Sequence, residues 1–421
     1  MTGKLTENDY ALWLFNIRGI GNKSIDKLLC GDRTCKEIYS MDKKELSMFL
    51  SEKQVDSLIK SRNIWDFEKE RRKLENKGIK FISRIDDEYP EKLKNIADPP
   101  FALYVKGRLP NPDKPAVAII GARMCSEYGR YMARQIGRGL AFAGVQVISG
   151  MARGVDGISQ KAALQAGGAS YAIVGSGVDV CYPDDNRDVY EELCLSGGVI
   201  SEYPPGTEPK ANFFPMRNRI ISALSDVVVV VEARRKSGTQ ITVDTALEQG
   251  REVLACPGRL TDRLSDGCNY LISQGAGVVI DVNDVIDRLW HVRSRAAAQN
   301  RLLQMPAADA QNRTLQMPAA AAQTGSKSTS SGDAMWEDDN ENGALTSYPG
   351  SVLELVDPEE ALETAILESV DVIPISSSGI MEKISERGIE ISVPELMKKL
   401  FDMSNMGKLS QNGVYFLKRE F

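Results

Sequence analysis

The chain has 421 residues, of which 42% are hydrophobic and 26% are charged, and its formal net charge is −6 at pH 7. These proportions are ordinary for a globular protein, and the length suffices for two or three domains. No apolar stretch approaches the roughly 18 residues that a membrane helix needs, and the N-terminus carries Lys4, Glu7 and Asp9 where a secretory signal would be apolar. We therefore expect a cytoplasmic protein without a membrane partner.

Residues 1–75 have the hydrophobic spacing of several short amphipathic helices, and no convincing strand interrupts them. Between two of these helices, Gly19-Ile20-Gly21 is followed by Lys23 and Ser24. This order resembles a helix-hairpin-helix turn, in which glycines let backbone N–H groups approach a phosphate. A tight turn inside a small helical bundle is the alternative. The sequence thus predicts a helical domain of the SAM or helix-hairpin-helix kind over residues 1–75.

Residues 79–290 alternate between strand-like and helix-like segments. Largely apolar runs, typical of buried strands, occur at 116–120, 145–148, 170–174 and 227–231. Helix-like spacing occurs at 130–143, 158–166 and 240–249. Such alternation predicts an α/β domain with a doubly wound parallel sheet, of the extended Rossmann-like kind.

Residues 291–355 predict a disordered acidic linker. Residues 300–311 (NRLLQMPAADAQ) are nearly repeated as 312–323 (NRTLQMPAAAAQ), and a Ser/Gly-rich stretch and an acidic run follow. Such composition does not support a packed core. Residues 328–382 hold thirteen acidic residues and no Lys or Arg, which leaves a net charge of +7 on the rest of the chain. That excess is compatible with a polyanionic partner, although it is also common in proteins without one.

Residues 356–421 regain periodicity, with three amphipathic helices followed by a hairpin signal at Gln411-Asn412-Gly413. Three helices and a terminal hairpin are the order of a winged helix. The third helix carries few basic residues, Lys398 and Lys399, so we favour a protein-contact role for this domain.

The turns that follow the predicted strands carry most of the candidate site. In a doubly wound sheet, ligands bind outside the carboxyl ends of the strands. Gly121, Arg123 and Ser126 follow the first of these strands, and Gly150 and Arg153 follow the second. Small residues before a helix allow close approach of a phosphate, which the helix N-terminus favours, and an arginine adds a charged clamp. Turn glycines and helix caps without a ligand are the alternative.

A second group of candidates combines cations with aromatic rings. In the segment 210–225 (KANFFPMRNRIISALS), Lys210 and Phe213 precede Arg217-Asn218-Arg219, which we expect to open a helix. Lys236, Ser237 and Gly238 precede another predicted helix and form a further anion cradle. Arginines grip phosphates and aromatic rings stack on bases, so this combination indicates single-stranded nucleic acid. Core packing is the alternative explanation for the phenylalanines.

The residue inventory argues against catalysis and against a cofactor. His291 is the single histidine, and the seven cysteines include no CxxC pair, so neither a His-dependent zinc site nor a Ser-His-Asp triad is expected. Gly175-Ser176-Gly177 lacks the third glycine of a dinucleotide loop, since residue 180 is valine, and no GxxxxGK[ST] loop occurs. We predict a binding protein with no catalytic residue, metal or cofactor.

Seven ordered segments resemble the DNA-processing protein A family, also called DprA or Smf. They are GARMCSEYG, SGMARGVD, GSGVDVCYPDDN, SEYPPG, FPMRNRIISALSD, VVVEARRKSGTQIT and CPGRLTDRLSDGCNYLI, within residues 79–287. The resemblance implies an extended Rossmann-like fold that binds single-stranded DNA without sequence preference. It also implies a homodimer that protects incoming strands in natural transformation and loads the RecA recombinase onto them.

By motif position, the resemblance implies a set of DNA-contacting side chains, namely Arg123, Lys210, Phe213, Arg217 and Arg219. The turns at Gly121, Gly150 and Ser237-Gly238 would supply backbone N–H groups. Two positions depart from the family: Ala122 replaces a usual serine, and Gln160 stands where many relatives have histidine.

The alternative is an enzyme. The same fold superfamily includes nucleoside-monophosphate phosphoribohydrolases, and Glu232 beside Ser237-Gly238-Thr239 could be the remnant of such a site. Those enzymes carry a PGGxGT loop, which residues 235–239 match only at Gly-Thr.

Overall fold

The computed structural model describes residues 4–303, 358–369, 375–385, 391–406, 409–412 and 415–418. The chain divides into two compact units, Met1–Met305 and Pro306–Phe421. Helix α14 (Val282–Leu303) continues well past residue 291, so the predicted linker does not begin there. Residues 304–357, the remainder of that prediction, lie outside the described residues. Within the described part of the chain, none of the helices is long and apolar enough to cross a membrane.

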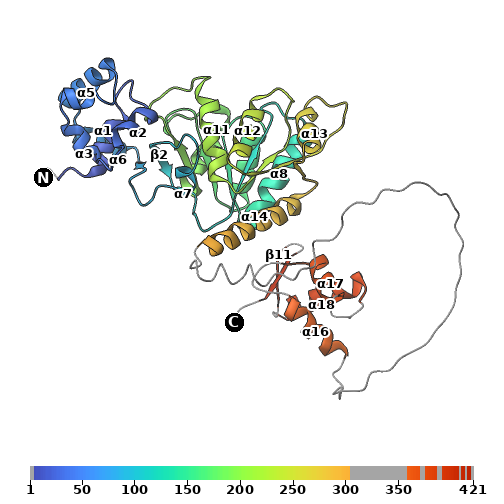
Figure 1. Ribbon diagram of the computed structural model, residues 1–421. Helices are drawn as coiled ribbons and strands as arrows, with labels where there is room; N and C mark the ends of the chain where they lie inside the picture. Colours follow the sequence, from blue (N-terminus) through green and yellow to red (C-terminus); the bar gives the residue numbers. More distant parts are fainter. Residues whose placement is uncertain are drawn as a thin grey trace, which may run out of the picture. The chain divides into compact units, whose positions relative to one another are not determined.

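The N-terminal part is helical, as predicted (Figure 1). Its helices are α1 (Glu7–Phe15), α2 (Asn22–Leu29), α3 (Cys35–Ser40), α4 (Lys43–Leu46), α5 (Glu52–Ile64) and α6 (Phe67–Asn76). Capping boxes start several of them; in α1, Thr6 and Asp9 satisfy each other's backbone N–H groups. The helices surround Trp13, which is fully buried and donates its indole N–H to Ser61 Oγ at 2.9 Å.

The N-terminal core extends into the next part of the chain. Phe101 and Ala102, at the start of a strand, are fully buried in the same cluster as Trp13. The ring of Phe101 lies 5.9 Å from that of Phe15. The helices and the sheet therefore share one apolar interface.

A nine-stranded sheet forms the centre of the first unit. Its strands are β1 (Ile79–Ser83), β2 (Ala102–Gly107), β3 (Ala116–Ile120), β4 (Gln146–Ser149), β5 (Ser170–Ile173), β6 (Gly198–Ser201), β7 (Val227–Val230), β8 (Glu252–Ala255) and β9 (Gly277–Val278). They lie in the order β1-β2-β6-β5-β4-β3-β7-β8-β9. The predicted parallel sheet is confirmed from β6 to β9, whereas β1 and β2 add an antiparallel edge that was not predicted.

Helices cover both faces of this sheet (Figure 1). They are α7 (Glu91–Lys94), α8 (Glu127–Phe142), α9 (Val155–Gln165), α10 (Arg187–Ser196), α11 (Phe213–Leu224), α12 (Gly238–Glu248), α13 (Asp266–Ser273) and α14. Valines of β7 alternate between the two cores: Val228 and Val230 pack with α11 and α12, and Val227 and Val229 pack with α8 and α14. This is the predicted doubly wound, Rossmann-like arrangement.

The second unit contains α16 (Pro358–Ser369), β10 (Ile375–Ser376), α17 (Ser377–Ser385), α18 (Val393–Asn405), β11 (Leu409–Asn412) and β12 (Tyr415–Lys418). Its strands pair antiparallel in the order β10-β12-β11. Ile366, Ile380 and Leu400 are fully buried between the helices. Three helices and a terminal hairpin follow one another as the sequence predicts; the assignment as a winged helix stays a prediction.

Candidate nucleic-acid interface

A cavity of about 380 Å³ opens at the carboxyl ends of β3, β4 and β7. Of the predicted site residues, it brings together Gly121, Arg123, Arg217, Asn218, Ser237 and Gly238. Asp156, Phe214 and Thr239 also line it. The turns that follow separate strands thus meet at one edge of the sheet, as the topology requires.

The N-terminus of α12 forms one wall of the cavity. Ser237 is the N-cap residue, but its side chain makes no capping hydrogen bond. Its Oγ is buried and has no hydrogen-bond partner among the described residues. Nothing would lie within 4 Å of a Cβ at Gly238, so there is room for a ligand group beside the first residue of the helix. A phosphate oxygen placed here would accept hydrogen bonds from the helix N-terminus, and from the hydroxyl after a rotation of the Ser237 side chain toward the cavity.

Arg123 and Phe214 form another part of the cavity lining. The Arg123 guanidinium carbon lies 5.3 Å from the centre of the Phe214 ring, and the exposed ring of Tyr182 lies 5.7 Å from the same centre. Arg123 is exposed and makes no ion pair within residues 4–303. A cation beside an aromatic ring can bind a phosphate while the ring stacks on the adjacent base.

Arg217 lines the base of the cavity, but its position differs from the prediction. Helix α11 begins at Phe213, so Arg217 lies in its second turn and not at the helix start. The side chain is 5% exposed, and its guanidinium donates to the carbonyl oxygens of Gly150 (2.7 Å) and Ile173. A Cβ at residue 150 would lie 2.0 Å from Nη2 of Arg217, so glycine is needed there to admit the arginine. Gly150 thus makes room for a side chain, whereas the sequence assigned it to phosphate.

Asp156 compensates the charge of Arg217. Burial lowers the pKa of Arg217 to about 10, and the attraction of Asp156 opposes this shift. Burial likewise raises the pKa of Asp156, and the positive charge of Arg217 opposes that shift. These two buried charges offset each other. The uncompensated positive charge in the cavity lining therefore belongs to Arg123.

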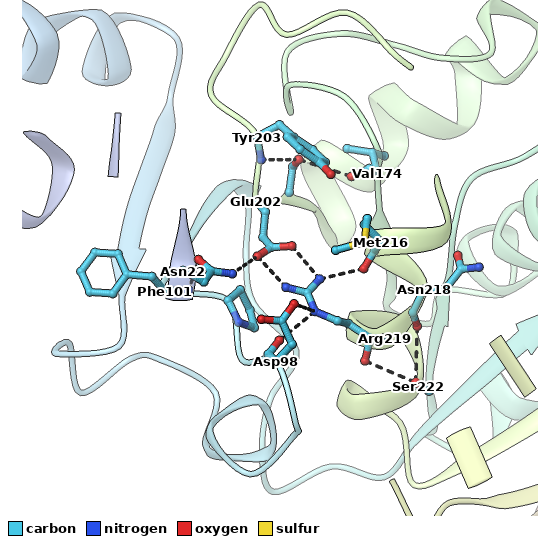
Figure 2. A network of polar contacts seen from close by, with 12 residues as sticks. Asn22, Asp98, Phe101, Val174, Glu202, Tyr203, Met216, Asn218, Arg219 and Ser222 are labelled. Carbon is cyan, nitrogen blue, oxygen red and sulfur yellow. Dashed lines mark hydrogen bonds and ion pairs between the residues drawn. The ribbon is translucent and has the colours of Figure 1, made fainter. Parts of the chain in front are cut away.

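Arg219 does not line the cavity, and its predicted role as a DNA contact is not supported by its position. Figure 2 shows its guanidinium enclosed by acidic groups: Nη1 and Nη2 each donate to Glu202 at 2.7 Å, and Nε donates to the carbonyl oxygen of Asp98 at 2.8 Å. Arg219 is 8% exposed. Burial opposes its charge, but the hydrogen bonds and negative charge of Glu202 outweigh this and raise the pKa of Arg219.

The Gly19–Gly21 turn meets the same network. Asn22, the first residue of α2, donates to Glu202 at 3.1 Å and accepts from the backbone N–H of Phe101 at 3.2 Å (Figure 2). Asn22 thus ties the start of α2 to the sheet domain, whereas Gly19 and Gly21 are exposed and have nothing within 4 Å of a Cβ, so the phosphate-binding and the structural reading of this turn both stay predictions. Arg219 joins α11 to this N-terminal part.

Ser126 also has an internal partner. It is the N-cap of α8, and its backbone N–H (2.9 Å) and hydroxyl (2.5 Å) both donate to the buried carboxylate of Glu232. The anion that we expected from a ligand at this helix N-terminus is thus a side chain of the protein. A Cβ at Gly129, in the first turn of α8, would lie 2.2 Å from Oε2 of Glu232.

Replacing Gly129 by alanine should therefore destabilise the first unit by about 1–3 kcal/mol, because the carboxylate of Glu232 has to move from a closely packed place. Urea denaturation measures this loss. The control is Gln135→Ala on the exposed side of the same helix, which should change the free energy of unfolding by less than about 0.5 kcal/mol. Equal stability of the Gly129 variant and the parent would mean that Glu232 is not fixed at the helix N-terminus.

Four other predicted residues lie outside the cavity lining, namely Arg153, Lys210, Phe213 and Lys236. Arg153 is paired with Asp185 at 2.5 Å. Phe213 stacks on Tyr203 with ring centres 4.0 Å apart, and Lys210 lies 5.6 Å from the Phe213 ring. Lys236 is exposed beside Ser237. Phe214, and not Phe213, is the ring that faces the cavity.

The family model described as DNA recombination-mediator protein A matches residues 80–290, which include the whole cavity. The chain belongs to this family. DNA processing protein DprA of Streptococcus pneumoniae is 42% identical over 205 residues, which cover 49% of this chain and 72% of that protein. The predicted resemblance is therefore confirmed.

A solved structure of a family member agrees with the fold. The X-ray structure of DNA processing protein A from Streptococcus pneumoniae matches with a TM-score of 0.58 and 33% identity, over 68% of this chain and 98% of that one. A structure of DNA processing protein A from Helicobacter pylori, described in terms of its single-stranded DNA binding mode, matches with a TM-score of 0.46 and 32% identity, over 51% and 96% of the two chains.

In this member of the DNA recombination-mediator protein A family, two aromatic residues of the site, Phe214 and Tyr182, are absent from the DNA-contacting set that the resemblance implied. Phe214 follows Phe213 directly, and only the helix start at Phe213 decides which ring faces the cavity. Tyr182 lies in the loop after β5. The feature of the sequence that identifies Tyr182 as a candidate is its place in a loop at the carboxyl end of a strand, because binding residues are common in such loops.

Proposed function

We propose that this protein binds single-stranded DNA without sequence preference, with one phosphate at the N-terminus of α12 and a base on Phe214. The observation that carries the proposal is that one cavity is lined both by the N-terminus of α12, where the Ser237 hydroxyl has no partner among the described residues, and by Arg123 beside Phe214. A duplex would not fit this arrangement, because its bases are paired and stacked and cannot reach a ring in the lining of a cavity.

In this proposal the bound strand is protected during natural transformation and handed to the RecA recombinase by a homodimer in the cytoplasm. The family description as a recombination mediator supports this assignment. A mediator should accelerate assembly of RecA on DNA that is covered by single-strand binding protein, and sedimentation of the purified protein would give its oligomeric state.

The phosphoribohydrolase alternative is less well supported. Its candidate acid, Glu232, is 1% exposed and accepts hydrogen bonds from Ser126 at the N-terminus of α8. A carboxylate engaged in this way is not placed to act on a ligand in the cavity. Release of free base from AMP or GMP at appreciable turnover would reverse this choice.

Fluorescence anisotropy with labelled oligo-dT and with a duplex of equal length, titrated at several salt concentrations, tests the proposal. We expect tighter binding to oligo-dT, with affinity that falls as salt rises because phosphate contacts release counterions. Equal affinity for the two, or preference for the duplex, would contradict the proposed site.

A further inference from the structure

A basic surface lies beside the cavity and is not explained by it. It is formed by two loops, which we call the basic loop pair: residues 234–236 between β7 and α12, and residues 259–263 between β8 and α13. Its cations are Arg234, Arg235, Lys236, Arg259 and Arg263, and all are exposed. The first loop leads directly into Ser237 and Gly238 of the cavity wall.

The two loops are held together by backbone hydrogen bonds. The Ala233 N–H donates to Leu264 O at 2.9 Å, and the Gly267 N–H donates to Ala233 O at 2.8 Å. The side chain of Asn269 bonds both the N–H and the carbonyl oxygen of Gly258, at 3.1 and 3.0 Å. The ends of the two loops are therefore held next to each other, and a bound polyanion would not have to bring two independent loops together.

The other side of the cavity differs in charge balance. There the surface cations are neutralised by aspartates: Arg153 pairs with Asp185, Lys161 with Asp188, Arg187 with Asp184 and Lys77 with Asp179, at 2.5–2.7 Å.

In the basic loop pair, by contrast, no ion pair is formed by Arg234, Lys236, Arg259 or Arg263 with any described residue. Arg235 lies 4.1 Å from the ring centre of Tyr270. The basic loop pair thus concentrates unpaired cations, although Lys210, which follows β6, also has no ion pair among the described residues.

We propose that the basic loop pair is a second DNA-binding surface, over which a single strand continues after it leaves the cavity past Ser237. The strand's phosphates contact Arg259, Arg263 and the cations of the first loop. Leu260, 89% exposed between the two arginines, offers an apolar contact for a base. This inference rests on the proposed function, since the occupant is the same strand that fills the cavity.

The test compares the parent with the double variant Arg259→Ala/Arg263→Ala. An oligo-dT of about 5 nucleotides occupies the cavity, whereas one of about 20 nucleotides also reaches the loops. We expect the double variant to bind the long oligonucleotide about fivefold more weakly, with a salt slope reduced by about 1.4 for two lost phosphate contacts, and to bind the short one like the parent.

The matched control is Arg108→Ala/Lys114→Ala, which removes the same charge from exposed positions at the amino ends of the strands. It should leave both affinities nearly unchanged. Thermal melting establishes that both double variants are folded, as expected for exposed side chains.

The outcomes separate the two proposals. If the double variant binds the long oligonucleotide like the parent while Arg123→Ala weakens binding, the basic loop pair is not a DNA-binding surface. The cavity then remains the proposed DNA-binding site. An equal loss for short and long oligonucleotides would also overturn the second surface, because the substitutions would then act on the cavity. If Arg123→Ala changes neither affinity, the proposed function itself fails.

Discussion

Replacing Arg123 by alanine should lower the affinity for oligo-dT more than tenfold. Arg123 is the lining cation that has no acidic partner in residues 4–303, so its removal takes away a phosphate contact that no neighbouring lining side chain replaces. It also removes the cation from the face of Phe214, 5.3 Å away. Loss of one phosphate contact reduces the slope of log affinity against log salt by about 0.7 for a single strand. Anisotropy titrations at several salt concentrations measure both effects.

The control for Arg123 is Arg108→Ala, which removes one exposed arginine at the amino ends of the strands. It should reduce the affinity less than twofold, because a single distant charge is screened at physiological salt. Stability of the Arg123 variant should equal that of the parent, since the side chain is exposed. Binding of Arg123→Ala at parental strength would show that the strand does not pass through the cavity.

Replacing Arg219 by methionine should destabilise the first unit by about 3–5 kcal/mol, because Glu202 and Asp98 would keep negative charges near a buried site without their counter-ion. Glu202 would retain only Asn22 among the side-chain donors to its carboxylate described in the structure. Denaturant unfolding followed by circular dichroism measures the loss. Under conditions where the variant is folded, we expect its affinity for oligo-dT to stay within about threefold of the parent, since Arg219 is remote from the cavity lining.

Arg153→Ala is the matched control for Arg219, because it breaks an exposed ion pair with Asp185. Such pairs contribute about 0–1 kcal/mol. A strong loss of DNA affinity in the folded Arg219 variant, with little loss of stability, would restore the DNA-contacting role that the sequence assigned to it.

The apolar runs made the interior of the fold predictable, and the edge strands were harder to find. Strands such as Val227–Val230 are buried on both faces and appear in the sequence as continuous valines. β1 mixes exposed and buried residues and pairs antiparallel, so neither its composition nor a strand–helix–strand order marks it. The turns after β3, β4 and β7 were placed correctly at one edge because topology alone brings them together.

The roles of the arginines could not be deduced in the same way. Arg217 and Arg219 are two residues apart on a helix and so point in different directions, which a sequence shows only when the helix start is known. Because the helix begins at Phe213, the side chain of Arg217 points toward the carboxyl ends of the strands, where it bonds Gly150. The side chain of Arg219 points toward Glu202. Buried arginines are rare, so exposure was the natural expectation for both. Their acidic partners, Asp156 and Glu202, are distant in sequence and gave no local signal.

The shared interface between the N-terminal helices and β2 has a consequence for how this protein can be divided. A fragment that starts at residue 79, where the matched family region begins, would leave Phe101 and Ala102 facing water in place of Phe15 and its neighbours. It would also remove Asn22 from Glu202. Newly exposed aromatic surface beside an edge strand promotes association between chains. The smallest fragment that preserves the native packing of the sheet therefore retains the helices that precede it.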